Sequence, residues 1–312
     1  MAYSAKTEEE LKEIGKTKKR MEKGKLFAYT IALPAIVIVL LVNVYPFFYS
    51  LWMSFHKIDA VKKTNTFVWF GNYIKIAGDE QVLNSVFVTV WFAIVVVAST
   101  ILLGIGIAYL LNQNFKGRTI LRTLLVLPWA ISEIINGLIW QFMYSSQFGV
   151  INSLLLSLGL IQEKIGFMAQ GFTALNLVAL AYIWNQAPLG AILILAALQA
   201  VPRDELDSGL VDGANAIQRF RHIVFPYLRP TILIVLLLFT FNAFRQFDLI
   251  FIMTTGGPGT ATSTMSWYSY TITFKYFKFG YGAAVAWLLS LISVVIAMGY
   301  MKVMYKKGEE VF

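Results

Sequence analysis

The chain has 312 residues, of which 58% are hydrophobic and only 14% are charged, and its formal net charge is +9. A soluble domain carries about 25% charged residues, so this composition excludes that class and indicates a membrane protein. Cysteine is absent, which excludes disulfides, zinc–thiolate sites and cysteine nucleophiles.

Residues 1–25 are polar and mixed in charge, with a Glu-rich start followed by a run of Lys and Arg. We predict a cytoplasmic N-terminal tail; attraction to anionic lipid at the membrane surface is the alternative. The segment is too long and too acidic for the first region of a signal peptide. Residues 26–312 form the predicted membrane domain.

Six apolar stretches follow, and each provides the roughly 20 residues that a helix needs to cross a bilayer. We predict spans at about 26–52, 82–112, 121–144, 172–198, 231–254 and 282–305. The third is interrupted by Pro128 and Glu133, and the fourth contains Pro188. Residues 56–80 are expected to form an outer loop or a short interfacial helix, and Gly104 and Gly106 a site of close helix packing. The predicted fold class is an all-α integral membrane protein with six transmembrane helices.

The distribution of basic residues predicts the orientation. The N-terminal tail, the turn between the second and third spans, the polar segment 201–230 and the C-terminal tail hold most of the 26 Lys and Arg residues. By the positive-inside rule, both termini and segment 201–230 are cytoplasmic. The net charge therefore reflects membrane topology, and we expect the lipid bilayer, with no nucleic acid, as its partner.

Segment 201–230 is a polar stretch between two apolar ones. Pro202 can start a helix over residues 203–211, because its missing N–H would be unpaired there in any case. Gly213 can break that helix by adopting positive φ. A second helix is expected from Ala214, capped by Asp212. It would end at Phe225-Pro226, and Pro230 would open the next span.

The second helix of this segment has an apolar side and a charged side. The apolar side carries Ile217, Phe220, Ile223 and Val224, and the other carries Gln218, Arg219, Arg221 and His222. Such a helix–turn–helix suits docking into a groove on another protein. An ordinary structured loop is an equally good interpretation on these grounds alone.

The spacing within the segment resembles a known motif. Asp207-Ser208-Gly209 is followed, after three residues, by Gly213 and, after nine more, by Ile223-Val224-Phe225-Pro226. This is similar to the coupling loop, or EAA loop, of ATP-binding-cassette (ABC) importer permeases, whose central Asp-Gly-Ala matches Asp212-Gly213-Ala214. Asp207, Ser208 and Gly209 depart from the usual Glu, Ala and Ala. The resemblance implies ATPase-coupling roles for Asp207, Ser208, Gly209, Asp212, Gly213, Ala214, Phe220, Ile223 and Pro226.

Other motifs resemble those of carbohydrate-type permeases. Phe247-Asp248, then Thr255-Gly256-Gly257-Pro258-Gly259 and Thr262, look like the fifth-span exit of the maltose- and glycerol-phosphate-type subunit. Leu127-Pro128-Trp129, with Trp140, Gly149 and Asn152, is also typical of that subunit. The resemblance implies a type I importer fold and the transport of a sugar or related polar solute. It also implies that the outer turn Gly256, Gly257, Pro258 and Gly259 contacts a binding protein; a simple tight turn is the alternative.

The same resemblance implies a set of partners. They are a second, homologous but non-identical permease subunit, two copies of a cytoplasmic ABC ATPase and an extracytoplasmic solute-binding protein. ATP and Mg would be bound by the ATPase, so no cofactor is expected in this chain. The location implied is the cytoplasmic membrane of a prokaryotic cell.

Polar residues within the fourth and fifth spans are candidates for the solute pathway. Arg245 and Asp248 are three residues apart, so we expect them to share a helix face and to pair. Charges inside a membrane are costly and often mark a pathway; an internal ion pair or a position at the outer interface is the alternative. The candidate pathway residues are Trp184, Asn185, Gln186, Asn242, Arg245, Gln246 and Asp248.

The sequence offers no catalytic chemistry. It contains no Gly-x-x-x-x-Gly-Lys-Ser/Thr phosphate loop. Its two histidines, His56 and His222, fall on opposite sides of the membrane in the predicted topology and cannot share a metal. We therefore expect no enzyme activity and no metal site. A stand-alone secondary transporter or channel, or a scaffold that recruits an ATPase, remains the alternative, and the solute could be a saccharide, a polyol or glycerol-phosphate.

Overall fold

A computed structural model describes residues 29–61 and 63–304. The predicted tail at 1–25 lies outside the described residues, as do the C-terminal residues 305–312. The chain divides into two compact units, Met1–Met53 and Ser54–Phe312. Helices dominate the described part of both, which confirms the predicted fold class apart from one small β-hairpin.

The described residues of the first unit are helical, from Tyr29 onward, and the helix ends at Ser54, the first residue of the second unit. It contains a π-helical turn, η1 (Leu40–Val44), followed by α2 (Tyr45–Ser54). The N–H of Tyr45 donates to the carbonyl of Leu40, five residues back. Pro46 follows and has no N–H with which to continue the usual pattern, so the wider turn falls where the proline disrupts the α-helix.

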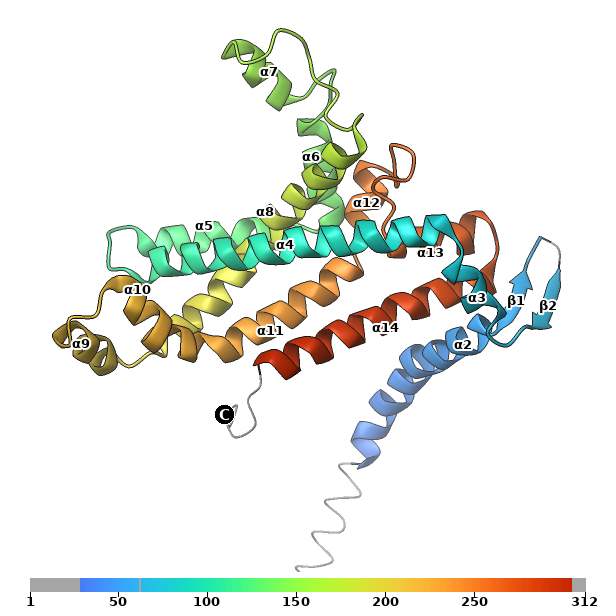
Figure 1. The fold of residues 1–312 in the computed structure, drawn as a ribbon, viewed down its shortest axis with the longest axis horizontal. Coiled ribbons are helices and arrows are strands. Elements are labelled where there is room, and N and C mark those ends of the chain that lie inside the picture. The colour runs from blue at the N-terminus through green and yellow to red at the C-terminus, as the bar shows by residue number, and fades with distance from the viewer. Residues whose placement is uncertain (1–28, 62, 305–312) are drawn as a thin grey trace, which may run out of the picture. The chain divides into compact units, whose positions relative to one another are not determined.

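Five single helices in the described residues, together with one bent pair, are long and apolar enough to cross a membrane. The second unit supplies all but the first of them, and Figure 1 shows their arrangement within that unit. They are α4 (Glu80–Asn112), the pair α5 (Arg118–Ala130) and α6 (Glu133–Met143), α8 (Gly171–Gln199), the stretch Ala216–Met253 and α14 (Phe279–Met304). Six crossings result if the bent pair counts as one.

The main core of the second unit lies where α11 (Phe225–Phe244) contacts α4, α8 and α14. Phe92 of α4, Tyr182 of α8 and Phe239 of α11 are all fully buried there. A Cβ atom on Gly104 would lie 3.2 Å from the backbone of Gly190 in α8. Glycine lets the two helix backbones approach closely at this crossing, which confirms the packing role predicted for Gly104. The same prediction is wrong for Gly106, where a Cβ atom would meet nothing within 4 Å.

The third predicted span, 121–144, is two helices and not one. α5 and α6 meet at an angle of 93°, and the break falls at Ile131 and Ser132, between the two interrupting residues. Pro128 lies inside α5, one turn before the break. Figure 1 shows α6 turning away from the direction of α5, with α7 (Val150–Ser157) beyond it.

The segment expected to be an outer loop or short helix, 56–80, contains both a hairpin and a helix. The elements are β1 (His56–Asp59), β2 (Thr64–Phe67) and α3 (Gly71–Ala77). The strands are antiparallel, with His56 opposite Phe67. The short helix agrees with the expectation, and the hairpin is an addition to it; Ile58, Thr64, Thr66 and Phe67 are residues that favour extended structure.

Asp79 connects α4, α13 (Met265–Tyr270) and α14 near the start of α4. Its Oδ1 accepts the N–H of Gln81 at 3.0 Å and so caps α4. Its Oδ2 accepts the hydroxyl groups of Tyr281 in α14, at 2.6 Å, and of Tyr268 in α13, at 3.2 Å. Burial alone would raise the pKa of Asp79, but the hydrogen bonds from Tyr281, Gln81 and Tyr268 hold it below its usual value.

This lowered pKa predicts a pH dependence. A carboxyl group whose pKa is lower in the folded state stabilises that state above its unfolded pKa of about 3.9, and the stabilisation is lost as the pH falls through the folded pKa. We expect the melting temperature of the purified protein to fall less on acidification below about pH 4 in Asp79→Asn than in the wild type. The measurement is a thermal melt across pH. Parallel curves for the two proteins would contradict this role of Asp79.

Candidate coupling loop and solute pathway

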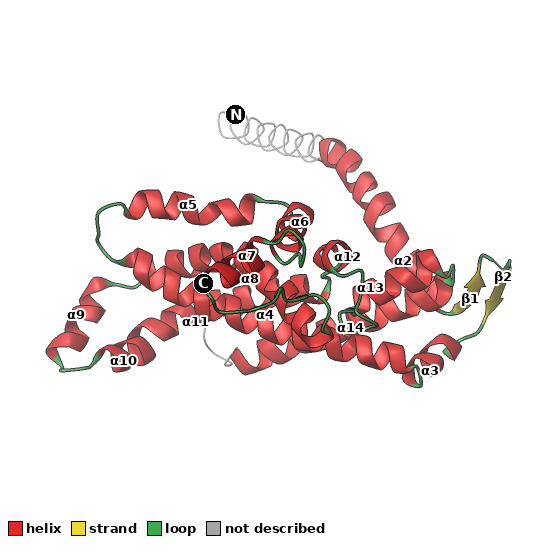
Figure 2. Cartoon of the chain, turned by 90° about the horizontal axis from the view of Figure 1, so that it is seen from above, coloured by secondary structure: helices red, strands yellow, loops and turns green. Residues whose placement is uncertain are grey.

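The polar segment 201–230 forms two short helices joined by a tight turn. They are α9 (Arg203–Val211) and α10 (Ala216–Arg219). In both Figure 1 and Figure 2 they lie beyond the neighbouring ends of α4, α5, α8 and α11. Gly213 has φ +76° in the turn, as predicted. This places the segment where it can contact a soluble partner at one end of the helices.

The cap of the second helix differs from the prediction. Asn215, and not Asp212, is the N-cap residue, and α10 begins at Ala216 and not at Ala214. The side chain of Asn215 accepts the N–H of Gln218, and the side chain of Gln218 accepts the N–H of Asn215, each at 2.9 Å. This reciprocal capping box satisfies two amide groups, so Asp212 is left exposed in the turn.

The end of the second helix also differs from the prediction. Phe225-Pro226 does not terminate it: a π-helical turn, η2 (Phe220–Val224), leads directly into α11, which contains Pro226 and Pro230. The N–H of Phe225 donates to the carbonyl of Phe220. A proline is tolerated in the first turn of a helix, and the wide turn absorbs the disruption as it does before Pro46. The loop of α9 and α10 is therefore joined to the fifth span by continuous helix.

Gly209 is buried where α9 packs against η2. A Cβ atom at this position would lie 2.7 Å from Cδ1 of Ile223, and the Arg219 side chain lies next to it. Glycine, where the motif usually has alanine, thus gives space to Ile223. Farther along, the hydroxyl of Tyr227 donates to the Glu205 carboxylate at 2.5 Å, which connects α9 to the start of α11.

The tip of the loop exposes apolar side chains. Val211 is 88% exposed and Ile217 is 79% exposed, and Leu210 is also exposed. Of the residues predicted to form the apolar side of the second helix, Ile217 is exposed and Val224 is buried. The sequence analysis did not predict that Leu210 and Val211 are exposed at the tip. The pattern that could have indicated it is a pair of adjacent apolar residues at the end of a charged helix. Exposed apolar residues at a tip are suited to a partner's groove.

Gly213 provides a direct test of the turn. A Cβ atom there would have no neighbour within 4 Å, so a substitution acts only through the backbone. We expect Gly213→Val to weaken ATP-coupled transport severalfold, because positive φ costs a β-branched residue about 1–3 kcal/mol. Gly213→Asn is the matched control, since asparagine tolerates this conformation. Equal transport by the two variants, measured as initial uptake rates, would exclude the backbone explanation.

Two candidate pathway residues of α8 form hydrogen bonds at the break between α5 and α6. The Nδ2 of Asn185 donates to the carbonyls of Pro128, at 2.6 Å, and Ile131, at 3.1 Å. The Nε2 of Gln186 donates to Oδ1 of Asn185 at 2.7 Å. Both residues are buried, whereas Trp184 is 38% exposed and its ring meets that of Trp140 edge-on.

Arg245 and Asp248 do not share a helix, contrary to the prediction. α11 ends with Arg245 as its C-cap, and α12 (Asp248–Met253) starts at Asp248. The structure records no ion pair between these two described residues. Asn242 and Arg245 are exposed, and Gln246 is buried. The fifth span, predicted as 231–254, is therefore interrupted between Phe244 and Asp248, but without the sharp bend of the third span, since Ala216–Met253 counts as one membrane-crossing stretch.

The two breaks lie close together in the fold. Leu249 and Ile252 of α12 pack against Gly137 of α6, and the two helices are neighbours in Figure 1. Glu133, at the start of α6, is within electrostatic reach of Gln246 and Asp248. The sequence showed Glu133 only as an interruption, because the contact depends on residues more than 100 positions away.

Several buried polar atoms near these breaks lack a hydrogen-bond partner among the described residues. They include Oδ1 of Asn136, Nε1 of Trp140 and the hydroxyl oxygens of Tyr144 and Tyr182. Buried polar groups are normally paired. Here they leave hydrogen-bonding capacity unused inside the packing of α6 and α8.

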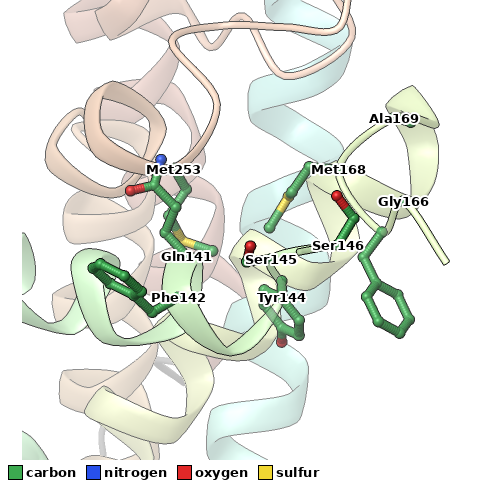
Figure 3. Close-up of a pocket in the computed structure, with 10 residues that line it drawn as sticks. Gln141, Phe142, Tyr144, Ser145, Ser146, Gly166, Met168, Ala169 and Met253 are labelled. Carbon is green, nitrogen blue, oxygen red and sulfur yellow. The ribbon is translucent and has the colours of Figure 1, made fainter. Parts of the chain in front are cut away.

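A cavity of about 460 Å³ lies at the far end of α6. Figure 3 shows Gln141 beside Met253 on one side, and Tyr144, Ser145 and Met168 on the other. None of these residues was among the predicted pathway set. The volume is in the range of small-molecule sites.

The glycine-rich outer turn is packed at one end and exposed at the other. Gly256 has φ +86° and lies against the ring of Trp267, where a Cβ atom would clash. The hydroxyl of Thr262 donates to the carbonyl of Gly257 at 2.8 Å. Pro258 and Gly259 are exposed and remain available for contact.

Interrupted membrane-crossing helices and a two-helix loop at one end define a membrane transport component, and comparison with known proteins gives its family. Residues 100–307 match the binding-protein-dependent transport system inner membrane component family. The chain belongs to this family. Its permeases are transport subunits, and ATP is hydrolysed by separate ATPase subunits in such importers.

Curated relatives cover nearly the whole chain. It is 33% identical over 293 residues to the trehalose/maltose transport system permease protein MalF of Thermococcus litoralis, covering 94% of this chain and 96% of the relative. It is 31% identical over 284 residues to the sulfoquinovosyl glycerol transport system permease protein SmoG of Agrobacterium fabrum, covering 91% and 92%.

A solved structure shares the fold. The chain is similar, with a TM-score of 0.80, to a chain of a bacterial ABC transporter involved in the import of the acidic polysaccharide alginate. The match covers 92% of this chain and 98% of the other, at 22% sequence identity. The fold is that of a type I ABC importer permease.

Proposed function

We propose that this chain forms part of the translocation pathway of an importer for a sugar or sugar-like polar solute. The observation that carries the proposal is the loop of α9 and α10, which has the coupling-loop spacing and runs without interruption into the fifth span. The relatives act on trehalose or maltose and on sulfoquinovosyl glycerol. Their names support a sugar-containing solute.

The proposed assembly contains this chain, a second homologous permease, two ABC ATPase subunits and an extracytoplasmic solute-binding protein. ATP and Mg are bound by the ATPases. The loop residues from Asp207 to Gly213, with the exposed tip, dock into an ATPase in the cytoplasm. Closure of the ATPase pair moves the attached helices as rigid bodies between inward- and outward-open states.

Within the membrane, the solute passes the paired breaks of the third and fifth spans. Asn242 and Arg245 are exposed there, and Trp184 offers an aromatic face. Asn185 and Gln186 serve the pathway by fixing the break, since their amide groups contact the backbone or one another. The glycine-rich turn at Pro258 and Gly259 faces the binding protein on the outer side.

One observation favours a second candidate function. Two acidic side chains, Glu133 and Asp248, lie within electrostatic reach of each other beside the breaks. Acidic residues inside spans are also what proton- or ion-coupled transporters use. A secondary transporter that works without ATP is therefore the competing hypothesis.

The composition of the purified assembly and its solute preference test the proposal. The chain should co-purify with a second permease and an ABC ATPase. Vesicles that contain the assembly should take up labelled mono- or disaccharides in the presence of the binding protein, and unlabelled sugars should compete. Uptake that does not depend on the binding protein would reject the proposed importer. Uptake that amino acids inhibit and sugars do not would reject the proposed solute class.

A further inference from the structure

A cavity of about 390 Å³ lies on the opposite side of the second unit from α9 and α10, between the hairpin, α3 and the start of α14. Figure 1 shows β1, β2 and α3 beyond the ends of α4 and α14. In the predicted orientation this is the outer, aqueous side. No residue of this cavity belongs to the coupling loop or to the solute pathway described above.

The walls of the cavity are fixed by contacts between the elements. The Nδ2 of Asn72 in α3 donates to the carbonyls of Ser54, at 2.7 Å, and His56, at 3.0 Å. The N–H of Ala60 donates to the carbonyl of Phe277 at 3.1 Å. Gly280, in the first turn of α14, lies so close to His56 that a Cβ atom would clash with its carbonyl oxygen. The cavity is thus preformed.

The cavity is positively charged. Three lysines line it, each from a different element: Lys57 from β1, Lys75 from α3 and Lys278 from the segment before α14. Asp59 is the one acidic residue that lines it, and its Oδ1 accepts the N–H of Val61 at 3.0 Å. All three lysines are exposed. Basic residues are scarce on the outer side of membrane proteins, so their convergence here needs a reason.

The same wall is connected to the membrane-crossing helices. The ammonium group of Lys75 lies 5.0 Å from the centre of the Tyr281 ring. The hydroxyl of Tyr281 donates to Asp79, which caps α4 and also accepts Tyr268 of α13. A ligand that holds Lys75 therefore contacts a hydrogen-bonded group that joins the outer ends of α4, α13 and α14.

We propose that this cavity is a docking site for Asp or Glu side chains on the surface of the extracytoplasmic solute-binding protein. The inference rests on the proposed function and adds to it a location and a chemistry. The family depends on a binding protein, the cavity faces the side from which that protein approaches, and its three ammonium groups complement carboxylates. Such charge complementarity mainly sets the encounter rate and the orientation of the partner.

The test measures how tightly the binding protein engages the complete transporter. The importer is reconstituted in nanodiscs of neutral phosphatidylcholine, and solute-loaded binding protein is titrated to find the concentration that gives half-maximal ATPase stimulation. For the wild type we expect this concentration to rise steeply with NaCl. For the triple variant Lys57→Glu, Lys75→Glu, Lys278→Glu we expect it to rise at least about tenfold, with a weaker salt dependence. The triple Lys→Gln variant should fall between the two.

Matched controls keep the test specific. Lys164→Glu reverses an exposed lysine of the outer segment that is far from the cavity in the sequence, and it should stay within about twofold of the wild type. Unchanged basal ATPase activity and assembly show that the variants fold.

Three results overturn the inference. One is a wild-type half-saturation that does not change with salt, and another is a triple variant that matches the wild type. The third is a lysine effect seen only in nanodiscs with anionic lipid, which assigns the cavity to a lipid headgroup. Wild-type ATPase activity that no binding protein stimulates would reject the proposed function itself, and is distinguishable because no variant is needed to see it.

Discussion

Replacing Asn185 with leucine should destabilise the protein and lower transport more than tenfold. The Asn185 amide donates to the carbonyls of Pro128 and Ile131, and no other described residue donates to them from α8. Leucine would leave the Ile131 carbonyl and the Gln186 amide without this partner, whereas the Pro128 carbonyl keeps the N–H of Ile131 at 3.3 Å. Each unpaired buried polar group costs about 1–3 kcal/mol. We expect the free energy of unfolding to fall by about 2–4 kcal/mol in total.

The matched control is Asn176→Leu, the same substitution in the same helix. Asn176 donates to Phe172 of α8 and accepts Trp91 at 3.3 Å, so it does not touch the break. Its effect should be clearly smaller in thermal melts and in uptake. If the two variants behave alike, the break of the third span does not depend on Asn185.

Replacing Gly209 with leucine should uncouple ATP hydrolysis from transport. The side chain would enter the space of Ile223, whose Cδ1 lies 2.7 Å from where the first carbon would be. Overpacking costs about 1–3 kcal/mol, and here it separates α9 from η2. We expect transport to fall at least about tenfold, as a comparable loss of ATPase docking would produce. The measurement compares uptake with ATPase activity in the assembled transporter.

Two further variants make the Gly209 test specific. Gly209→Ala should stay near wild type, because the methyl group meets only the flexible end of Ile223 and alanine favours the helix by up to about 1 kcal/mol. Ile223→Ala in the Gly209→Leu background should restore part of the coupling by making room. A double variant no better than the single one would show that the defect lies outside this contact.

Local patterns in the sequence were enough to predict the membrane-crossing helices and the coupling-loop turn. Apolar stretches of sufficient length specify helices in lipid, where backbone groups must pair within the segment. Gly213 was predictable because positive φ is a local property of the chain. The choice between neighbouring residues as helix cap was harder to predict. Asn215, and not Asp212, is the N-cap of α10, because Gln218 lies three residues after Asn215 and completes the capping box.

The candidate pathway depends on contacts that no local pattern contains. Asn185 contacts Pro128 across 57 residues, so its role in the break of the third span could not be predicted from either stretch alone. The spacing of Arg245 and Asp248 predicts a shared helix face only if the helix is continuous, and it ends between them. Glu133 gained its importance only when the two breaks came together.

The energy source is the most direct test of the central claim, which is that this chain couples ATP hydrolysis to import. The complete assembly is reconstituted in proteoliposomes, with the binding protein outside and labelled sugar as the solute. We predict uptake that requires ATP inside, survives collapse of proton and sodium gradients by ionophores, and is lost in Gly209→Leu. Uptake that continues without ATP and stops when the ion gradients collapse would contradict the account and favour the secondary transporter.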